Sequence, residues 1–214
     1  MEIGYELKVV TTARQLEKQI LQEIVEQLNK IMLKNKFFVE NNVRNVLLRA
    51  FKSQPEYISL QGGKLQSELG VVDAKRKIDA IIDRWVNSIS LNIEKVKVVN
   101  VGFKGNISLL LAPAGFEDVL DMPEASYITR KGTKIEWLRW LLFEGDKYII
   151  REYDVGPDKT GIARTGLGQI MIRTKKNGWR VPPEYSGIAI DNFATRALIS
   201  VQDELNNEIF GIVK

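Results

Sequence analysis

The sequence predicts an α+β protein: a mostly helical amino-terminal half, then an antiparallel sheet with a short apolar helix and a C-terminal helix. Two observations support this prediction. Apolar residues recur every three or four positions through the first 90 residues, as in amphipathic helices, and from Leu91 onward they alternate as in strands. Because 214 residues suffice for a core, we expect a helical region, 1–90, and an α+β region, 91–214, within one compact domain.

A long helix is expected to open the amino-terminal region. Thr12 and Gln15 form a capping-box pattern, in which each side chain bonds the other residue's backbone amide. Helical spacing then runs to about Lys34. Two apolar edges follow this helix and are expected to form one broad buried stripe: Leu16, Ile20, Ile24, Leu28 and Ile31 on one edge, and Leu21, Val25 and Met32 on the other.

Further helices are expected before the strands begin. One covers 42–53 and stops before Pro55, and a short helical turn lies within 60–69, closed by Gly70. Asp73 is then expected to cap another helix with its side chain. The inward face of that helix is expected to carry Ile78, Ile81, Ile82, Trp85 and Ile89.

Two hairpins and two helices are expected after Leu91. The first hairpin joins 91–99 to 107–111 through a turn at 102–105, and the second joins 169–173 to 178–181 through the Asn-Gly turn at 175–178. A strand is expected at 147–153. The short apolar helix covers 135–144 and ends at Gly145. The last helix follows a cap at Asp191.

The composition excludes several classes of active site. The chain contains no Cys and no His, which removes thiol nucleophiles, Cys/His zinc sites, Ser-His-Asp triads and histidine acid–base catalysis. No apolar run approaches the roughly 20 residues that cross a bilayer, and no secretory signal is visible. We therefore expect a protein that is made in a cytoplasm, needs no disulfides and contacts no membrane.

Two motifs come close to known chemistry without reaching it. The segment 161–166 has the Gly-x4-Gly spacing of a phosphate-binding loop, but Leu167 and Gly168 stand where Lys and Ser or Thr are required. Glu6-Leu7-Lys8 and Asp73-Ala74-Lys75 match the tripeptide of metal-dependent nucleases, although such tripeptides are frequent by chance. The expectation is therefore a protein without a catalytic site, cofactor, metal or small-molecule substrate.

The distribution of charge is uneven between two neighbouring segments. Ten acids and six bases occupy 117–158, whereas 159–183 holds six bases and no acid. These bases could face nucleic-acid phosphates, protect a solvated hairpin edge, or pair with the acidic segment of a neighbouring copy. We expect them to form an assembly or DNA-facing surface: Lys159, Arg164, Arg173, Lys175, Lys176 and Arg180.

Several short blocks resemble the neck and tail-completion proteins of tailed bacteriophages. The clearest lie between residues 134 and 200: EWLRWLLFEGD at 136–146, IIREY at 149–153, ARTG at 163–166, WRVPPEYSG at 179–187 and DNFATRAL at 191–198. A fainter block, GKLQSELG, lies at 63–70. The resemblance rests on the order of these blocks, and none of them is a catalytic signature.

The resemblance implies a virion structural protein that is made in the host cytoplasm and is not an enzyme. Such proteins form homomeric rings stacked between portal and tail tube, with genomic DNA in the channel and other neck, portal or tail proteins as partners. It leaves open whether the ring is a head-closure adaptor, a neck collar or a tail terminator. The alternative hypothesis is a phage nucleic-acid-binding or metal-dependent nucleic-acid-processing protein.

Overall fold

A computed structural model describes residues 12–100, 102–111, 116–129, 131–175 and 178–213. It confirms the α+β fold class, with a long first helix, antiparallel strand pairs and C-terminal helices. In chain order the helices and strands are α1 Ala13–Lys52, α2 Pro55–Leu60, α3 Lys64–Leu69, α4 Ala74–Asn87, β1 Ile89–Val99, β2 Gly102–Leu111, α5 Glu117–Leu120, β3 Tyr127–Ile128, β4 Lys134–Ile135, α6 Trp137–Phe143, β5 Tyr153–Pro157, β6 Gln169–Arg173, α7 Phe193–Ser200 and α8 Gln202–Phe210. Short 3₁₀ turns occupy Pro123–Ala125 (η1), Pro183–Tyr185 (η2) and Gly211–Val213 (η3).

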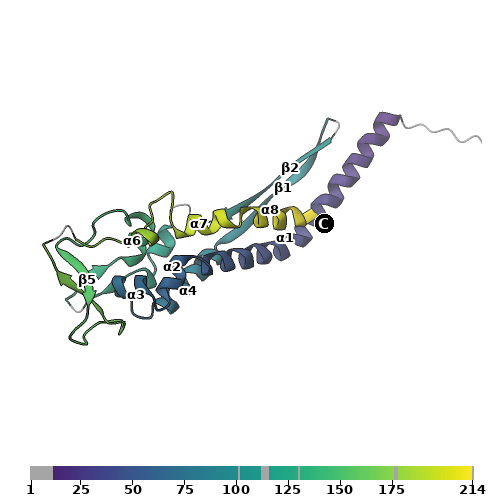
Figure 1. Ribbon diagram of the computed structural model, residues 1–214. Coiled ribbons are helices and arrows are strands. Elements are labelled where there is room, and N and C mark those ends of the chain that lie inside the picture. The colour runs from purple at the N-terminus through teal and green to yellow at the C-terminus, as the bar shows by residue number, and fades with distance from the viewer. Residues whose placement is uncertain (1–11, 101, 112–115, 130, 176–177, 214) are drawn as a thin grey trace, which may run out of the picture.

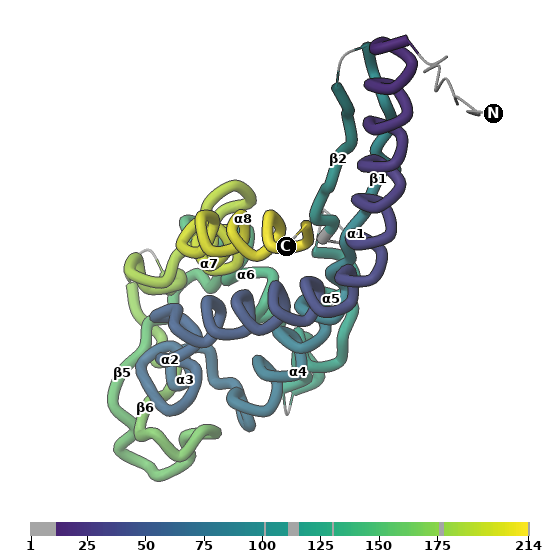
Figure 2. The backbone as a smooth tube through the Cα atoms, turned by 90° about the vertical axis from the view of Figure 1, so that its right-hand side faces the viewer, coloured from purple at the N-terminus to yellow at the C-terminus, as the bar shows by residue number. Residues whose placement is uncertain are grey.

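The molecule is elongated, with a globular head at one end and a thin arm at the other (Figure 1). We call the arm residues 13–34 of α1 together with the distal part of the β1–β2 hairpin, residues 93–107. The hairpin lies along α1, and the C-terminal helix α8 lies against α1 where the arm leaves the head (Figure 2). The remaining elements form the head.

Helix α1 is one continuous helix of 40 residues, so the prediction of two helices separated at 35–41 is wrong. The capping box at Thr12 and Gln15 is confirmed. Across the expected break, Asn35 donates to the backbone oxygen of Ile212 at 3.1 Å, and Glu40 accepts from the backbone nitrogen of Leu91 at 2.8 Å. These tertiary contacts stabilise a helical stretch whose local propensity is modest.

The start of α4 differs from the expected capping geometry. The helix does follow Asp73, but Asp73 has a left-handed φ of 54° and its side chain makes no capping hydrogen bond. The inward face is confirmed for Ile78, Ile81, Ile82 and Trp85, all buried. Ile89 instead begins β1. A left-handed residue directs the chain into the helix here, and the carboxylate remains in solvent.

The first hairpin is confirmed, but its turn lies nearer the middle of the segment than predicted. The strands β1 and β2 pair from Ile89↔Leu111 to Val99↔Gly102, with a β-bulge between Glu94 and Lys97. The glycine at 105 therefore lies within a strand. A Cβ at Gly105 would approach Val96 Cγ2 to 2.8 Å, so this glycine allows close cross-strand packing.

The second hairpin is formed by different strands from those predicted. β6 pairs with β5, from Tyr153↔Arg173 to Pro157↔Gln169, so neither the strand at 147–153 nor the pairing of 169–173 with 178–181 is correct. Trp179 instead bridges Ile150, donating to its oxygen at 2.8 Å. Any side chain at Gly178 would overlap the Ile150 backbone. That glycine is needed for the close approach to Ile150.

Two predicted helix ends also use other residues. Asn192, not Asp191, caps α7: its Oδ1 accepts from the nitrogens of Ala194 and Thr195 at 3.0 and 3.1 Å. The terminal helix is divided at Val201 into α7 and α8. At the end of α6, Gly145 does not adopt a left-handed conformation. It donates to the oxygen of Gly187 at 3.0 Å, in a contact too close for a Cβ.

An aromatic cluster joins the elements of the head. Phe51 at the end of α1 stacks on Trp85 of α4, with ring centroids 5.4 Å apart. Phe193 of α7 contacts both rings, at 6.3 and 5.7 Å. Phe116 contacts Trp85 at 5.2 Å and Phe143 of α6 at 6.0 Å. The cluster therefore connects α1, α4, α6 and α7 in one core.

The ion pair between α2 and α7 provides a test of this packing. Glu56 is buried, and Arg196 donates to it and, at 2.7 Å, to Asp191. Arg196→Ala leaves the Glu56 charge buried without its partner, so we expect a loss of about 3 kcal/mol in unfolding free energy, measured by urea denaturation. Arg173→Ala, which breaks an exposed pair with Glu152, is the control and should cost about 0–1 kcal/mol. Equal effects of the two substitutions would contradict the assignment.

Candidate assembly surfaces

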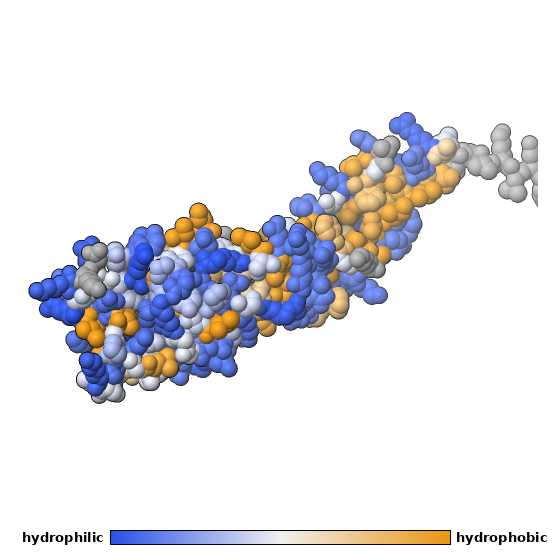
Figure 3. Space-filling view, viewed as in Figure 1, coloured by the Kyte–Doolittle hydropathy of each residue, from blue (hydrophilic) through white to orange (hydrophobic). Residues whose placement is uncertain are grey.

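Five large apolar side chains lie exposed along the arm portion of α1, and four of them share one side of the helix. Leu16, Ile20, Ile24 and Ile31 are 53%, 52%, 41% and 37% exposed. Steps of four, four and seven residues place them on one side of the helix. We had expected this edge of the helix to be buried. The space-filling view shows a continuous hydrophobic surface over the arm (Figure 3).

The other predicted edge of α1 is the one that faces the hairpin. Val25 and Met32 are buried, and Leu21 is half-buried. Beside them the Asn29 amide donates to the oxygen of Val96 at 3.0 Å and accepts from its nitrogen at 2.9 Å. The strand thus packs on a single edge of the helix. The prediction of one broad buried stripe is wrong because a two-stranded hairpin is too narrow to cover both edges.

The second strand of the hairpin adds to the exposed apolar surface. Phe103 pairs with Val98 and so lies on the hairpin face that carries the buried Val96, yet it is 51% exposed. Alternation along the strands places these side chains on the helix-facing side. We define the arm face as Leu16, Ile20, Ile24 and Ile31 of α1 together with Phe103 of β2.

In the head, by contrast, the chain covers α1 with its own C-terminal helices. Three side chains of α1, spaced seven residues apart, donate hydrogen bonds to the C-terminal segment. Asn35 donates to Ile212 O at 3.1 Å, Asn42 to Glu208 at 2.8 Å and Arg49 to Glu204 at 2.6 Å. Five helical turns, or 18 residues, before Asn42 and Arg49, the same side of α1 carries Ile24 and Ile31, which are exposed. This side of α1 is polar where α8 and η3 cover it and becomes apolar beyond them.

The basic residues singled out in the sequence lie in two groups. Lys159 and Arg164 follow the Pro157 end of the β5–β6 hairpin. Arg173 and Lys175 lie at its Tyr153 end, and Arg180 follows Trp179, which bridges Ile150. All five are exposed. Arg173 pairs with Glu152 at 3.0 Å, so some of the expected charge complementarity is satisfied within one copy. Lys176 lies outside the described residues.

The glycine-containing loop after β5 is organised by one carboxylate. Asp158 accepts hydrogen bonds from the nitrogens of Thr160, Gly161 and Ala163 and from the Thr160 hydroxyl. The Thr160 hydroxyl, followed by these backbone amides, lowers the pKa of Asp158 below its ordinary value. Because the folded-state pKa is depressed, this contribution to loop order is present above the ordinary Asp range. It is lost only as the pH falls through the folded-state pKa.

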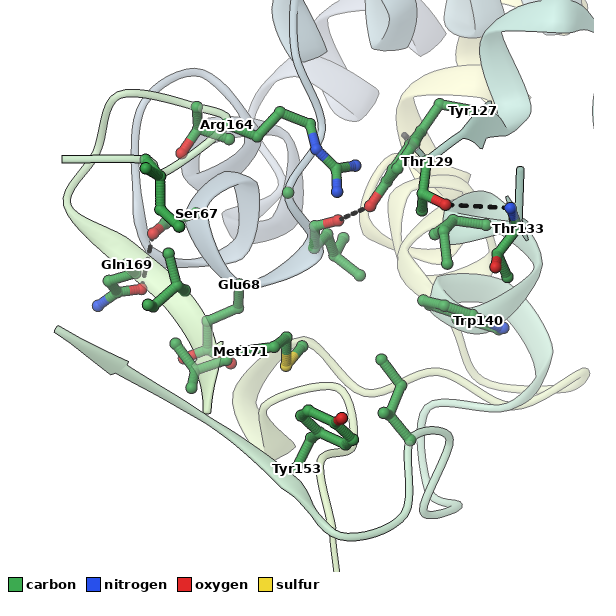
Figure 4. A pocket seen from close by; sticks show the side chains of 18 of the residues that line it. Ser67, Glu68, Tyr127, Thr129, Thr133, Trp140, Tyr153, Arg164, Gln169 and Met171 are labelled. Atoms are coloured by element: carbon green, nitrogen blue, oxygen red, sulfur yellow. Dashed lines mark hydrogen bonds between the residues drawn. The ribbon is translucent and has the colours of Figure 1, made fainter. Parts of the chain in front are cut away.

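A cavity of about 580 Å³ lies beneath this loop, between α3, the β3–β4 hairpin and the β5–β6 hairpin (Figure 4). The guanidinium of Arg164 lies over the Tyr127 ring at 4.6 Å, and the Tyr127 hydroxyl donates to Leu69 O at 2.8 Å. Burial raises the pKa of Tyr127. Arg164 thus packs on Tyr127 of the head. No local pattern in the sequence predicts this cavity, because its walls come from three distant segments.

The polar groups in the cavity are engaged with one another. Ser67 donates to Gln169 at 2.6 Å, and Trp179 donates its indole N–H to Glu68 at 2.9 Å. Burial raises the pKa of Glu68, the one carboxylate among the described residues lining the cavity. With a single carboxylate, already bonded to an indole, the described walls hold no pair of carboxylates.

The described residues hold neither a metal-binding cluster nor a membrane-spanning helix. No group of three or more Asp or Glu side chains there could hold a metal ion. Within the same described ranges, no helix is long and apolar enough to span a bilayer. Of the two nuclease-like tripeptides, Glu6-Leu7-Lys8 falls outside the described residues, and Asp73 starts α4 in solvent.

The loop organised by Asp158 can be tested by proteolysis. Asp158→Asn removes an acceptor charge that holds three backbone amides, so trypsin should cleave after Lys159 and Arg164 faster than in the unchanged protein. Asp154→Asn, a neighbouring carboxylate that accepts from Val155 N at 2.8 Å, is the control and should leave cleavage unaltered. Unchanged cleavage in Asp158→Asn would show that the loop is held by other contacts.

Comparison with known proteins gave no match: neither a family model, nor a curated protein, nor a solved structure matches the chain.

Proposed function

We propose that this protein is a non-enzymatic structural subunit that assembles with copies of itself into a ring. The observation that carries the proposal is the arm face, which has no covering partner among the described residues of its own chain. The sequence resemblance supports placing the ring in the neck of a tailed phage virion, with genomic DNA in its channel. Other neck, portal or tail proteins would stack on it.

Energetics favour covering the arm face. Fully burying a Leu, Ile or Phe side chain contributes about 1.5–3 kcal/mol, and the five side chains of the arm face are each 37% to 53% exposed. Covering them therefore supplies several kcal/mol toward association, against the translational and rotational cost of binding. Large contiguous apolar surfaces on soluble proteins commonly mark interaction sites.

The charge distribution is compatible with DNA in the channel of the ring. The chain carries a net charge of +4, and Lys159, Lys175 and Arg180 are exposed. Phosphate contacts by such side chains are independent of base sequence and weaken as salt rises. A channel wall needs this kind of contact, because the genome must pass without being held at one sequence.

The proposal predicts that charges on the arm face abolish assembly. Sedimentation over a range of concentrations should show oligomers of the unchanged protein and monomers of the double variant Ile20→Glu, Ile24→Glu, because buried unpaired carboxylates are costly. The matched control is Gln19→Glu, Gln22→Glu. It adds the same charge at exposed positions that point elsewhere on the helix, and it should still assemble.

Two results would count against the proposed function. The unchanged protein could remain a monomer at every concentration, or the Ile20 and Ile24 double variant could assemble normally with an unaltered circular dichroism spectrum. Magnesium-dependent cleavage of DNA by the purified protein would favour the nucleic-acid-processing alternative instead.

A further inference from the structure

The C-terminal helices carry a second exposed apolar surface. Phe210 of α8 and Val213 of η3 are 69% and 45% exposed, and Ile199 at the end of α7 is 68% exposed. Leu205 and Ile212, on the inner side of the same segment, are buried. We define the outer face as Phe210, Val213 and Ile199. The segment α7–η3 thus packs on its own chain through Leu205 and Ile212 and leaves the three side chains of the outer face exposed.

The arm face begins at the place where this segment stops covering α1. The protein's own α8 and η3 bind α1 at Arg49, Asn42 and Asn35. Five helical turns before Arg49 and Asn42, the same side of α1 carries Ile31 and Ile24 of the arm face. Figure 2 shows α8 against the middle of α1, with the arm extending beyond it. A segment with exposed apolar side chains, supplied by another copy, would therefore cover α1 beyond the place where the protein's own α8 and η3 stop.

The two surfaces also differ in charge. The arm, with the hairpin residues that flank it, holds seven bases and four acids over 13–34 and 89–111, whereas 193–213 holds one base and three acids. Asp203 is exposed on α8, and Lys18 and Lys97 are exposed in the arm. Opposite charges around two apolar surfaces steer them together and fix their register. Two copies of the arm placed face to face would instead bring like charges together.

We propose that the arm face of one copy packs on the outer face of α7–η3 in the next copy. A second copy of this chain thus covers the arm face, and it does so with its outer face rather than with its own arm. Such heterologous contacts form a closed ring when the rotation between neighbours closes. The inference rests on the proposed function and specifies which surface of the neighbour is used.

The absence of cysteine from the sequence makes disulfide cross-linking a clean test. Ile20→Cys and Phe210→Cys are prepared as two separate full-length proteins, each with a single thiol at an exposed position. Under mild oxidation, the mixture of the two should give a disulfide-linked dimer containing one copy of each variant. Neither protein alone should do so, since each copy then carries a thiol on only one side of the contact.

The control mixes Ile20→Cys with Lys75→Cys instead of Phe210→Cys. Lys75 is an exposed residue of α4 that the proposed contact does not include. This pair should give no dimer. Sedimentation of each cysteine variant under reducing conditions establishes that it still assembles.

The possible outcomes separate the inference from the function on which it rests. Cross-linking of Ile20→Cys with itself would show arms packed two-fold on one another and would overturn the heterologous contact. Oligomers without any Ile20–Phe210 cross-link would overturn it as well, leaving self-assembly intact. A protein that is monomeric throughout would overturn the proposed function and the inference together.

Discussion

The stacked contact between Phe51 and Trp85, centroids 5.4 Å apart, is the interaction on which the arrangement of the molecule depends. It fixes the carboxyl end of α1 to α4, and Phe193 joins both rings to α7. Aromatic pairs of this kind add about 0.5–1.5 kcal/mol beyond their buried area. Because α1 is anchored at this end, its amino-terminal half projects from the head with only a hairpin for support. The exposed arm face follows from that geometry.

The segments 63–70, 136–146, 179–187 and 191–198, which are far apart in the sequence, contribute contacts that hold the head together. Trp179 of one block donates to Glu68 of another at 2.9 Å, across 111 residues of chain. Trp179 also contacts Trp140 of a third block at 6.1 Å. In the block at 191–198, Asn192 caps α7 and Arg196 reaches Glu56. Each block supplies contacts that close the fold.

The side of α1 that the C-terminal helices cover in the head differs in polarity from the corresponding side in the arm. In the head, α8 and η3 cover one side of α1 through three side-chain hydrogen bonds, whereas five turns earlier, in the arm, the same side carries Ile24 and Ile31. A polar side chain suits a surface bound to backbone or carboxylate oxygens, and an apolar one suits a surface covered by apolar atoms. The side of α1 that is polar under α8 and η3 is therefore apolar in the arm, as the proposed contact with a second copy requires.

The sequence alone determined the local features of this protein. The capping box at Thr12, the apolar period of α1, the inward face of α4 and the presence of the first hairpin depend on neighbours close in the chain, so they could be predicted. Only the tertiary structure decided which apolar edge of α1 is buried, because both edges are hydrophobic and a narrow hairpin covers one. The pairing of β6 with β5, the bridge from Trp179 to Ile150 and the cavity beside Arg164 are likewise tertiary. Choosing among distant partners depends on packing that no local pattern contains.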